Sequence, residues 1–330
     1  MTVELYYYIF LVLVGLFFCV RQIKSERLFS LLSFMLLAIY SIITRYSGFD
    51  IDMNTYSETL ESSNLSVYYL KEPVFWITSR CLYKLTESPE ITFIIYDLVS
   101  FILILKARKN MKLPQYFVFL YILFFPSVMG LNNVYRQYLA HSILIYSISL
   151  TMINAGFFKK SFFILLSMLT HNVSALFTPL FFMINKKKYI SISSIFVSAC
   201  ILLLLPFALS SKSDSDTGTL NAEVYLVVIF FILIFYIASF RLRLNEMAAK
   251  FFYYFMYIII LCSASTLLMG SAQSKRVGMF ALIISLIPMV IAIEHNYKQR
   301  ALVRTIIFTI LISPTLLFSS SLEMLLTKST

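Results

Sequence analysis

Apolar stretches recur along the whole sequence, and they restrict what this chain can fold into more than any other feature. A helix needs roughly 20 apolar residues to cross the hydrocarbon core of a bilayer. Stretches near this length cover residues 5–20, 28–43, 91–105, 116–129, 137–153, 161–184, 190–209, 224–240, 251–269, 277–293 and 301–318. Only 13% of the residues are charged, below the roughly 25% of soluble domains. The sequence therefore predicts an all-α polytopic transmembrane protein, with residues 1–330 forming a single domain.

Basic residues in the connecting segments predict the orientation in the membrane. The net charge is +11, and most of the excess lies in short segments, where Lys and Arg favour the cytoplasmic side. These residues are Arg21, Lys24, Arg27, Lys106, Arg108, Lys109, Lys112, Lys159, Lys160, Lys186, Lys187, Lys188, Arg241, Arg243, Lys298, Arg300 and Arg304. If all of them are cytoplasmic, both chain ends and the long segment 44–90 lie outside. A charge that sets orientation gives no support for nucleic-acid binding.

The stretch 161–184 has lysines on both sides, at 159–160 and at 186–188. A single crossing would put them on opposite sides of the membrane, so we expect a hairpin of two short helices that is broken near His171 and Asn172. With this pair the chain makes about twelve crossings. A break at membrane depth must be packed in protein or line a cavity. This makes His171 a candidate functional residue, with a structural histidine as the alternative.

A polar face interrupts the apolar sequence around the start of the stretch 137–153. Its members follow helical spacing at i, i+3, i+4, i+7 and i+8: Asn133, Arg136, Gln137, Ala140 and His141. Because a lipid-facing arginine is costly, we expect this face to line a hydrated groove. The alternative is that Arg136 only extends from the helix end to the membrane surface.

Two further arginines lie on the side that should be poor in basic residues. Arg45 closes the second apolar stretch, and Arg276 opens the tenth. Each could be an anchor at the membrane surface. Together with Arg136 they favour an anionic ligand on this side, because the guanidinium fork donates two parallel hydrogen bonds to phosphate.

The outside segment 44–90 contains a predicted helix from Pro73 to about Leu85. Apolar residues recur there at helical spacing and proline suits a first helical turn, so we expect an amphipathic helix in the membrane interface. Glu72, just before it, would either cap this helix or act as a general base. Asp50 and Asp52 form a short acidic pair of a kind that can hold a divalent metal. A solvated loop pair is the simpler interpretation, and we expect no metal.

Several short motifs occur in order along nearly the whole chain. They are Arg45-Tyr46-Ser47-Gly48-Phe49-Asp50 followed by Tyr56, Glu72-Pro73-Val74-Phe75, Asn133-Val134-Tyr135-Arg136-Gln137 with Ala140, Thr170-His171-Asn172-Val173-Ser174-Ala175-Leu176, and Arg276-Val277-Gly278. As an ordered set they resemble the EpsG family, a branch of the Wzy-type polysaccharide polymerases.

The resemblance implies a GT-C-like membrane glycosyltransferase without a cofactor. Such an enzyme lies in the bacterial cytoplasmic (inner) membrane with its active site facing the periplasm or exterior. It joins oligosaccharide repeat units carried on undecaprenyl diphosphate into a surface polysaccharide, such as an O-antigen or exopolysaccharide. The implied partners are the polyprenyl-diphosphate-linked oligosaccharide, the lipid bilayer and, as a candidate, a chain-length regulator protein.

The residues suggest how such a reaction would proceed. Arg136, with Arg276 or Arg45, would stabilise the departing diphosphate without a metal. His171 is the first choice for the base that activates the acceptor hydroxyl, and Glu72 is the second. An apolar groove between helices would hold the prenyl tail. The expected substrate-binding residues are Arg45, Asp50, Tyr56, Asn132, Asn133, Gln137 and His141.

Three other functions remain open at this point. An oligosaccharide ligase of similar fold would transfer glycan to a different acceptor. A flippase or transporter would move the same lipid, although it would need polar groups along a path through both leaflets. A scaffolding membrane protein would tolerate the loss of Arg136.

Overall fold

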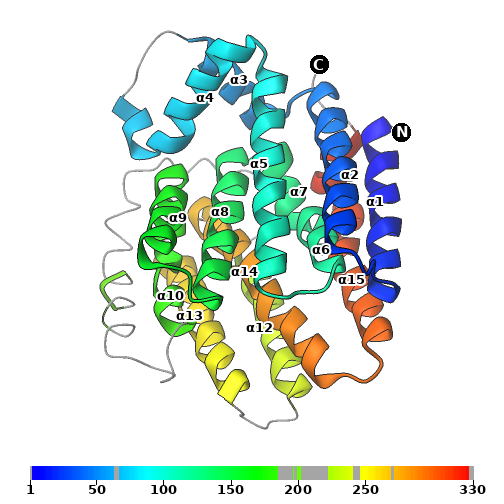
Figure 1. Ribbon diagram of the computed structural model, residues 1–330. Coiled ribbons are helices and arrows are strands. Elements are labelled where there is room, and N and C mark those ends of the chain that lie inside the picture. The colour runs from blue at the N-terminus through cyan, green and yellow to red at the C-terminus, as the bar shows by residue number, and fades with distance from the viewer. Residues whose placement is uncertain are drawn as a thin grey trace. The chain divides into compact units, whose positions relative to one another are not determined.

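The computed structural model describes residues 2–62, 67–184, 196, 199–201, 222–240, 246–268 and 271–326, and it is helical, without strands, over those residues (Figure 1). Six of the described helices are long and apolar enough to span a membrane: Val3–Val20, Glu26–Tyr46, Ala222–Ser239, Phe251–Leu268, Ala272–Asn296 and Arg300–Leu317. This confirms the prediction of an all-α chain with several apolar helices that fit a multi-pass membrane protein. Twelve crossings and the GT-C-like architecture stay predictions.

The chain divides into two compact units. The first contains residues 1–150, 156–172 and 301–330, and the second contains residues 151–155 and 173–300. The single membrane domain stays a prediction. The lysines at 186–188, most of the stretch 190–209, and residues 241 and 243 lie outside the described residues.

The first unit holds most of the helices. They are α1 (Val3–Val20), α2 (Glu26–Tyr46), α3 (Ile51–Glu61), the 3₁₀ helix η1 (Val67–Lys71), α4 (Pro73–Thr86), α5 (Pro89–Asn110), α6 (Tyr116–Leu123), α7 (Phe125–Asn132), α8 (Tyr135–Met152), α9 (Phe157–Thr170), α15 (Arg300–Leu317) and α16 (Ser319–Leu326). In Figure 1, α3 and α4 lie across the upper ends of α8 and α9.

Two ion pairs show how α2 and α5 run. Arg108, near the end of α5, pairs with Glu26 at the start of α2. Arg45, near the end of α2, pairs with Asp97 in the first half of α5. The two helices are therefore antiparallel, and the basic end of α5 lies beside the start of α2.

The stretch 116–129 was predicted to make one crossing, and this stays a prediction, but the stretch is not one continuous helix. It forms the two helices α6 and α7, of 8 residues each, separated by an extended Phe124 with ψ of 137°. Pro126 lies in the first turn of α7. Proline lacks the N–H for the helical bond and clashes with the carbonyl four residues before it. A helix of this length rises only about 12 Å, so neither half crosses a bilayer alone.

The predicted helix after Glu72 is present as α4, with Pro73 as its first residue. It ends at Glu87, whose φ of 53° turns the chain sharply. The side chain of Ser88 then accepts a hydrogen bond from the backbone N–H of Ile91 at 3.2 Å and caps α5. The position of α4 in a membrane interface stays a prediction.

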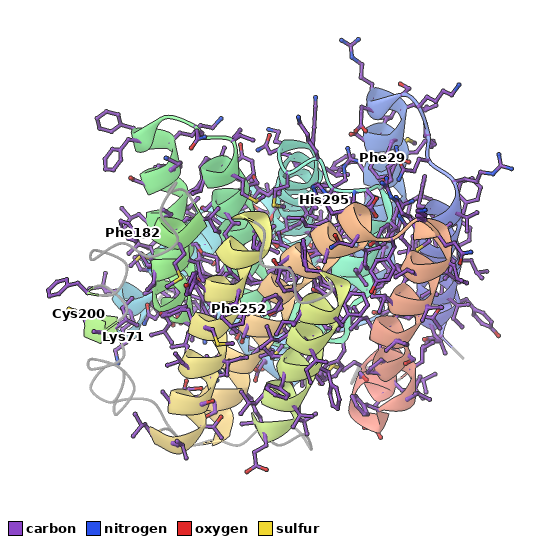
Figure 2. All side chains as sticks on the ribbon, turned by 90° about the horizontal axis from the view of Figure 1, so that it is seen from below. Phe29, Lys71, Phe182, Cys200, Phe252 and His295 are labelled. Carbon is purple, nitrogen blue, oxygen red and sulfur yellow. The ribbon has the colours of Figure 1, made fainter. Side chains whose placement is uncertain are left out.

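The second unit is built around α14 (Ser271–Asn296), which packs against α12 (Ala222–Ser239) and α13 (Glu246–Leu268). A Cβ built on Gly278 of α14 would lie 2.6 Å from the Cβ of Tyr225, so glycine permits the close approach of α12. The remaining described elements are η2 (Asn172–Phe177) and α10 (Pro179–Ile184). Figure 2 shows the side chains, with Phe182 on α10 and Phe252 on α13 labelled.

Candidate functional site

Three residues that are far apart in the sequence meet in the first unit, and they define what we call the Glu72 cluster: Glu72, Arg136 and His171. Glu72 directly precedes α4, Arg136 is the second residue of α8, and His171 directly follows α9. Each residue therefore lies where a helix begins or ends. All three are candidate catalytic residues predicted from the sequence, and the structure brings them into contact.

Glu72 connects the other two members. Its Oε1 lies 2.6 Å from Nδ1 of His171 and accepts a hydrogen bond from the backbone N–H of Asn172 at 3.4 Å. Its Oε2 forms an ion pair with Nη1 of Arg136. The Glu72 side chain makes no capping hydrogen bond to α4, so the carboxylate serves the cluster rather than the helix.

Burial makes these contacts strong. Glu72 is 2% exposed and His171 is 4% exposed. A buried carboxylate is very costly unless it is paired and hydrogen-bonded, and here both of its oxygens have partners. An ionised Glu72 accepts from Nδ1–H of His171, which leaves Nε2 as the basic nitrogen of the neutral ring. The tautomer is inferred from these contacts.

Arg136 lies against aromatic rings. Its guanidinium carbon is 5.4 Å from the ring centroid of Tyr56 and 5.0 Å from that of Trp76, and its Nε donates to the Tyr56 hydroxyl at 3.4 Å. Cation–π contacts of this kind hold an arginine in place. The side chain is 15% exposed, which does not fit the alternative that it only extends to the membrane surface. Trp76 was not among the predicted site residues, although it is the single tryptophan and follows Glu72 by one helical turn.

Arg45 does not join this cluster. Its side chain is 1% exposed, and its Nε and Nη2 donate to the two carboxylate oxygens of Asp97 at 2.8 and 2.9 Å. Its Nη1 donates to the carbonyl of Leu131 at 3.0 Å. These contacts give Arg45 a structural role, and its part in substrate binding stays a prediction. Asp97 was not among the predicted residues, although an acidic residue inside the apolar stretch 91–105 indicates that a buried cation lies nearby.

The expected polar face of α8 is interrupted at its start. Asn133 lies outside the helix, in the break between α7 and α8, with φ of −133° and ψ of −72°. Asn132 is the last residue of α7 and is 1% exposed. Gln137 and His141 do lie on α8, both buried, and His141 Nδ1 is 2.6 Å from the hydroxyl of Tyr121. The expectation that Asn133 continues the helical face was wrong.

The remaining candidates lie elsewhere. Asp50 precedes α3 and accepts a hydrogen bond from the backbone N–H of Ile51 at 2.8 Å. In the described part of the chain, no group of three or more His, Cys, Asp or Glu side chains could hold a metal ion. Arg276 belongs to the second unit, where its Nη1 donates to Oε1 of Gln273 on the same helix at 3.4 Å.

The Glu72 cluster lies at the end of the first unit that is away from its basic segments. His171 follows the last residue of α9, whereas the lysines at 159–160 lie in its first turn. The start of α8 lies beside the early turns of α5, because the Tyr135 hydroxyl lies 3.0 Å from the carbonyl oxygen of Phe93. The basic residues 108–109 are in the last turn of α5.

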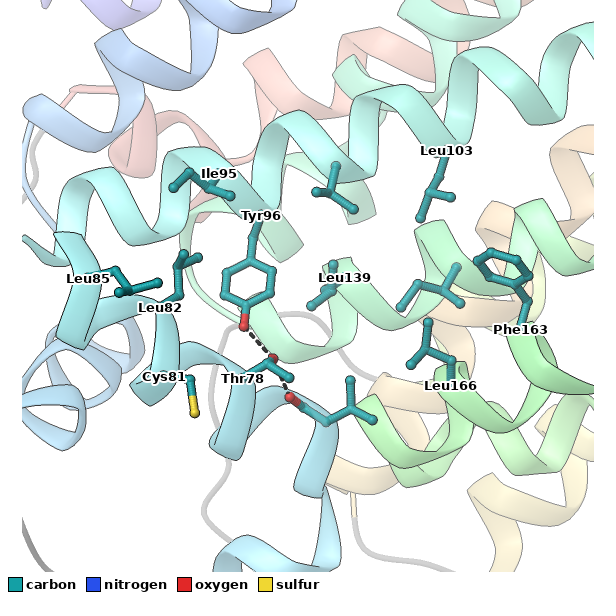
Figure 3. Close-up of a pocket in the computed structure, with 13 residues that line it drawn as sticks. Thr78, Cys81, Leu82, Leu85, Ile95, Tyr96, Leu103, Leu139, Phe163 and Leu166 are labelled. Atoms are coloured by element: carbon teal, nitrogen blue, oxygen red, sulfur yellow. Dashed lines mark hydrogen bonds between the residues drawn. The ribbon is translucent and has the colours of Figure 1, made fainter.

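An apolar pocket of about 460 Å³ lies between α4, α5, α8 and α9 (Figure 3). The Thr78 and Tyr96 hydroxyls in its wall are hydrogen-bonded to each other. Three of its four helices also carry or adjoin a member of the Glu72 cluster at one end. The lining residues are Val74, Thr78, Cys81, Leu82, Leu85, Ile95, Tyr96, Val99, Leu103, Leu139, Ile143, Phe163 and Leu166.

A model of the EpsG family matches residues 27–326, nearly the whole chain. No curated protein and no solved structure matches the sequence. The family is the one that the ordered motifs resemble.

Proposed function

Because the chain belongs to the EpsG family, whose members are Wzy-like polysaccharide polymerases, we propose that it joins lipid-linked oligosaccharide repeat units into a surface polysaccharide. The donor is the growing chain on undecaprenyl diphosphate, and the acceptor is a hydroxyl of the incoming repeat unit. The observation that carries this proposal is the Glu72 cluster, in which one buried carboxylate holds a histidine and an arginine side by side.

In the proposed reaction, Nε2 of His171 removes the proton from the acceptor hydroxyl as its oxygen bonds to the anomeric carbon of the donor. The bond from that carbon to the diphosphate oxygen breaks, and the diphosphate lipid leaves with the electron pair. Glu72 stabilises the imidazolium that forms, as the third member of a catalytic triad does. With both of its oxygens occupied, Glu72 is better suited to orient His171 than to act as the base itself.

Arg136 is the group that we propose for the leaving diphosphate. A guanidinium has five N–H donors in a fixed plane, so it can hold Glu72 and a diphosphate oxygen at the same time. A fixed positive charge that faces the negative charge developing on the leaving group stabilises the transition state strongly. We propose that this reaction needs no metal ion. Arg276 stays a proposal for the same role.

Saccharide binding is assigned to polar side chains around the Glu72 cluster. Tyr56 contacts Arg136 directly. Asn132 is the last residue of α7, and Asn133 lies in the break just before α8. The buried oxygens Oδ1 of both asparagines have no hydrogen-bond partner among the described residues, as expected where a ligand or water completes the site. Asp50, Gln137 and His141 stay weaker candidates for this role.

We propose the apolar pocket as the binding site of the prenyl chain. Its lining gives isoprene units apolar contacts, and it is formed by the helices that carry or adjoin the Glu72 cluster. The diphosphate would then lie at the boundary between the pocket and Arg136. The basic segments at the opposite end of the first unit support an outside-facing site in the cytoplasmic membrane, because short basic segments stay in the cytoplasm.

The test is Arg136→Ala in cells that make the polysaccharide. The expected result is loss of polymer with accumulation of single lipid-linked repeat units, at an unchanged level of membrane-inserted protein. Arg27→Ala is the matched control, because Arg27 is an exposed arginine on α2, and it should leave polymer unchanged. Polymer that is made but stays on the lipid carrier would indicate a ligase instead. Normal long chains in Arg136→Ala would refute the proposal.

A further inference from the structure

A buried ion pair between α2 and α5 reaches the break in the chain that precedes Arg136. The Arg45 side chain is 1% exposed and the Asp97 side chain is 0% exposed. Burying two charges gives little net stability compared with well-packed apolar residues. A reason other than stability is therefore needed for an arginine and an aspartate at these two places.

Asp97 has a partner on every side. Its Oδ2 accepts from Nε of Arg45 at 2.8 Å and from the Ser41 hydroxyl at 2.6 Å. Its Oδ1 accepts from Nη2 of Arg45 at 2.9 Å and from the Tyr135 hydroxyl at 2.7 Å. A carboxylate has about four acceptor positions, so this one is fully used. Tyr135 is the first residue of α8 and the neighbour of Arg136.

Arg45 holds the other side of the same break. Its Nη1 donates to the carbonyl of Leu131 at 3.0 Å. This carbonyl lies in the last turn of α7, where helix carbonyls have no partner within the helix. The guanidinium also lies over the Tyr135 ring, 4.6 Å from its centroid. The ion pair thus binds the end of α7 and the start of α8 at once.

We propose that Arg45 and Asp97 are positioning residues, which fix the break between α7 and α8 and thereby place Arg136 against Glu72. The proposal rests on the proposed function for its catalytic consequence. A lysine at position 45 could pair with Asp97 but lacks the fork that also reaches Leu131. A shift of about 1 Å in a catalytic group can cost on the order of a hundredfold in rate.

The test uses Tyr135→Phe, which removes the hydroxyl that binds Asp97 and also contacts the Phe93 carbonyl, and keeps the ring over Arg45. The matched control is Tyr138→Phe on the same helix, because the Tyr138 hydroxyl is buried with no hydrogen-bond partner in the described part of the chain. In purified protein, Tyr135→Phe should raise backbone hydrogen exchange at residues 131–138, since exchange reports local opening. The rest of the first unit should not change, and Tyr138→Phe should match the parent protein.

The catalytic arm measures chain growth on the lipid-linked fraction extracted from cells that lack the protein. Tyr135→Phe should lower the rate about ten- to hundredfold, but less than twofold when Arg136 is already lysine, because the effect passes through Arg136. Equal losses in both backgrounds, or unchanged exchange at 131–138, would overturn the positioning role. Hydrogen exchange can be measured whether or not the protein is a polymerase. Its result therefore tests the positioning role separately from the proposed function, which Arg136→Ala tests.

Discussion

Glu72→Gln is the change that tests the Glu72 cluster most directly, because it keeps the size of the side chain and removes its charge. In the parent protein both oxygens of Glu72 accept, one from Arg136 and one facing Nδ1 of His171. Glutamine has one oxygen and one NH2 group. Arg136 can only donate, so the amide oxygen must face Arg136 and the NH2 must face His171.

This arrangement changes the histidine. The amide NH2 donates to Nδ1, so the ring proton moves to Nε2, and the nitrogen that should remove the acceptor proton is blocked. In a catalytic triad, the acidic residue must hold the histidine in the tautomer that leaves the basic nitrogen facing the nucleophile. A positioned base contributes about 10²- to 10⁴-fold to a rate. At 1.36 kcal/mol per tenfold change, the expected loss is about 2.7–5.5 kcal/mol of transition-state stabilisation.

The double variant separates this mechanism from two independent losses. His171→Gln removes the base and should lower the rate by a similar factor. If Glu72 acts through His171, Glu72→Gln/His171→Gln should be no slower than the slower single variant, because residues that act as a unit are not additive. Two independent roles would multiply the two factors.

The assay is the initial rate of chain growth by purified protein in lipid nanodiscs, with lipid-linked repeat units from cells lacking the protein. Thermal unfolding of each variant controls for the loss of a charge-assisted hydrogen bond, which is worth about 1.5–3 kcal/mol. A double variant whose rate is the product of the two single factors would refute the reasoning. So would a Glu72→Gln protein with the parent rate.

Three further predictions concern the metal, the pocket and the second unit. A chelator should leave chain growth unchanged, measured with the parent protein and a metal-dependent glycosyltransferase as the positive control. Val99→Trp should fill part of the pocket and raise the KM for lipid-linked substrate roughly tenfold, because a tenfold loss of affinity corresponds to losing the burial of about two methylene groups. The control is Leu302→Trp, on an exposed face of α15, which should leave the KM unchanged. Gly278→Ala should destabilise the protein by about 1–3 kcal/mol in thermal unfolding, because its Cβ would meet Tyr225. Gly156→Ala, with open space around it, should have no effect.

The helical nature of the chain and the members of the Glu72 cluster could be predicted from the sequence. Long apolar stretches leave a membrane protein few options, and charges at odds with those stretches point to function. His171 was found because lysines on both sides of one stretch required a break, and α9 does end at Thr170. That Glu72 joins His171 to Arg136 could not be predicted, since helix packing decides which ends meet.

Arg45 shows where the sequence argument reached its limit. Its place outside the basic segments led us to predict an anionic ligand, but a carboxylate of the same chain satisfies an arginine equally well. Asp97 lies 52 residues away in the sequence, and no local pattern links the two. The break before α8 was missed for a related reason. Asn133 continues the helical spacing, whereas the contacts of Leu131 and Tyr135 at the break come from residues far away in the sequence.

The directions of the helices add an electrostatic argument to the contacts. Glu72 and Arg136 lie at the N-terminal ends of α4 and α8, where unpaired N–H groups carry the positive end of the helix dipole. An ionised Glu72 is favoured there even before Arg136 is counted. When negative charge develops on a diphosphate beside Arg136, these two helix ends and the guanidinium would stabilise it together. They need no rearrangement to do so, and charge that is already in place lowers the reaction barrier. Arg136→Lys should therefore keep part of the activity, because it loses the fork but neither the charge nor the two helix ends.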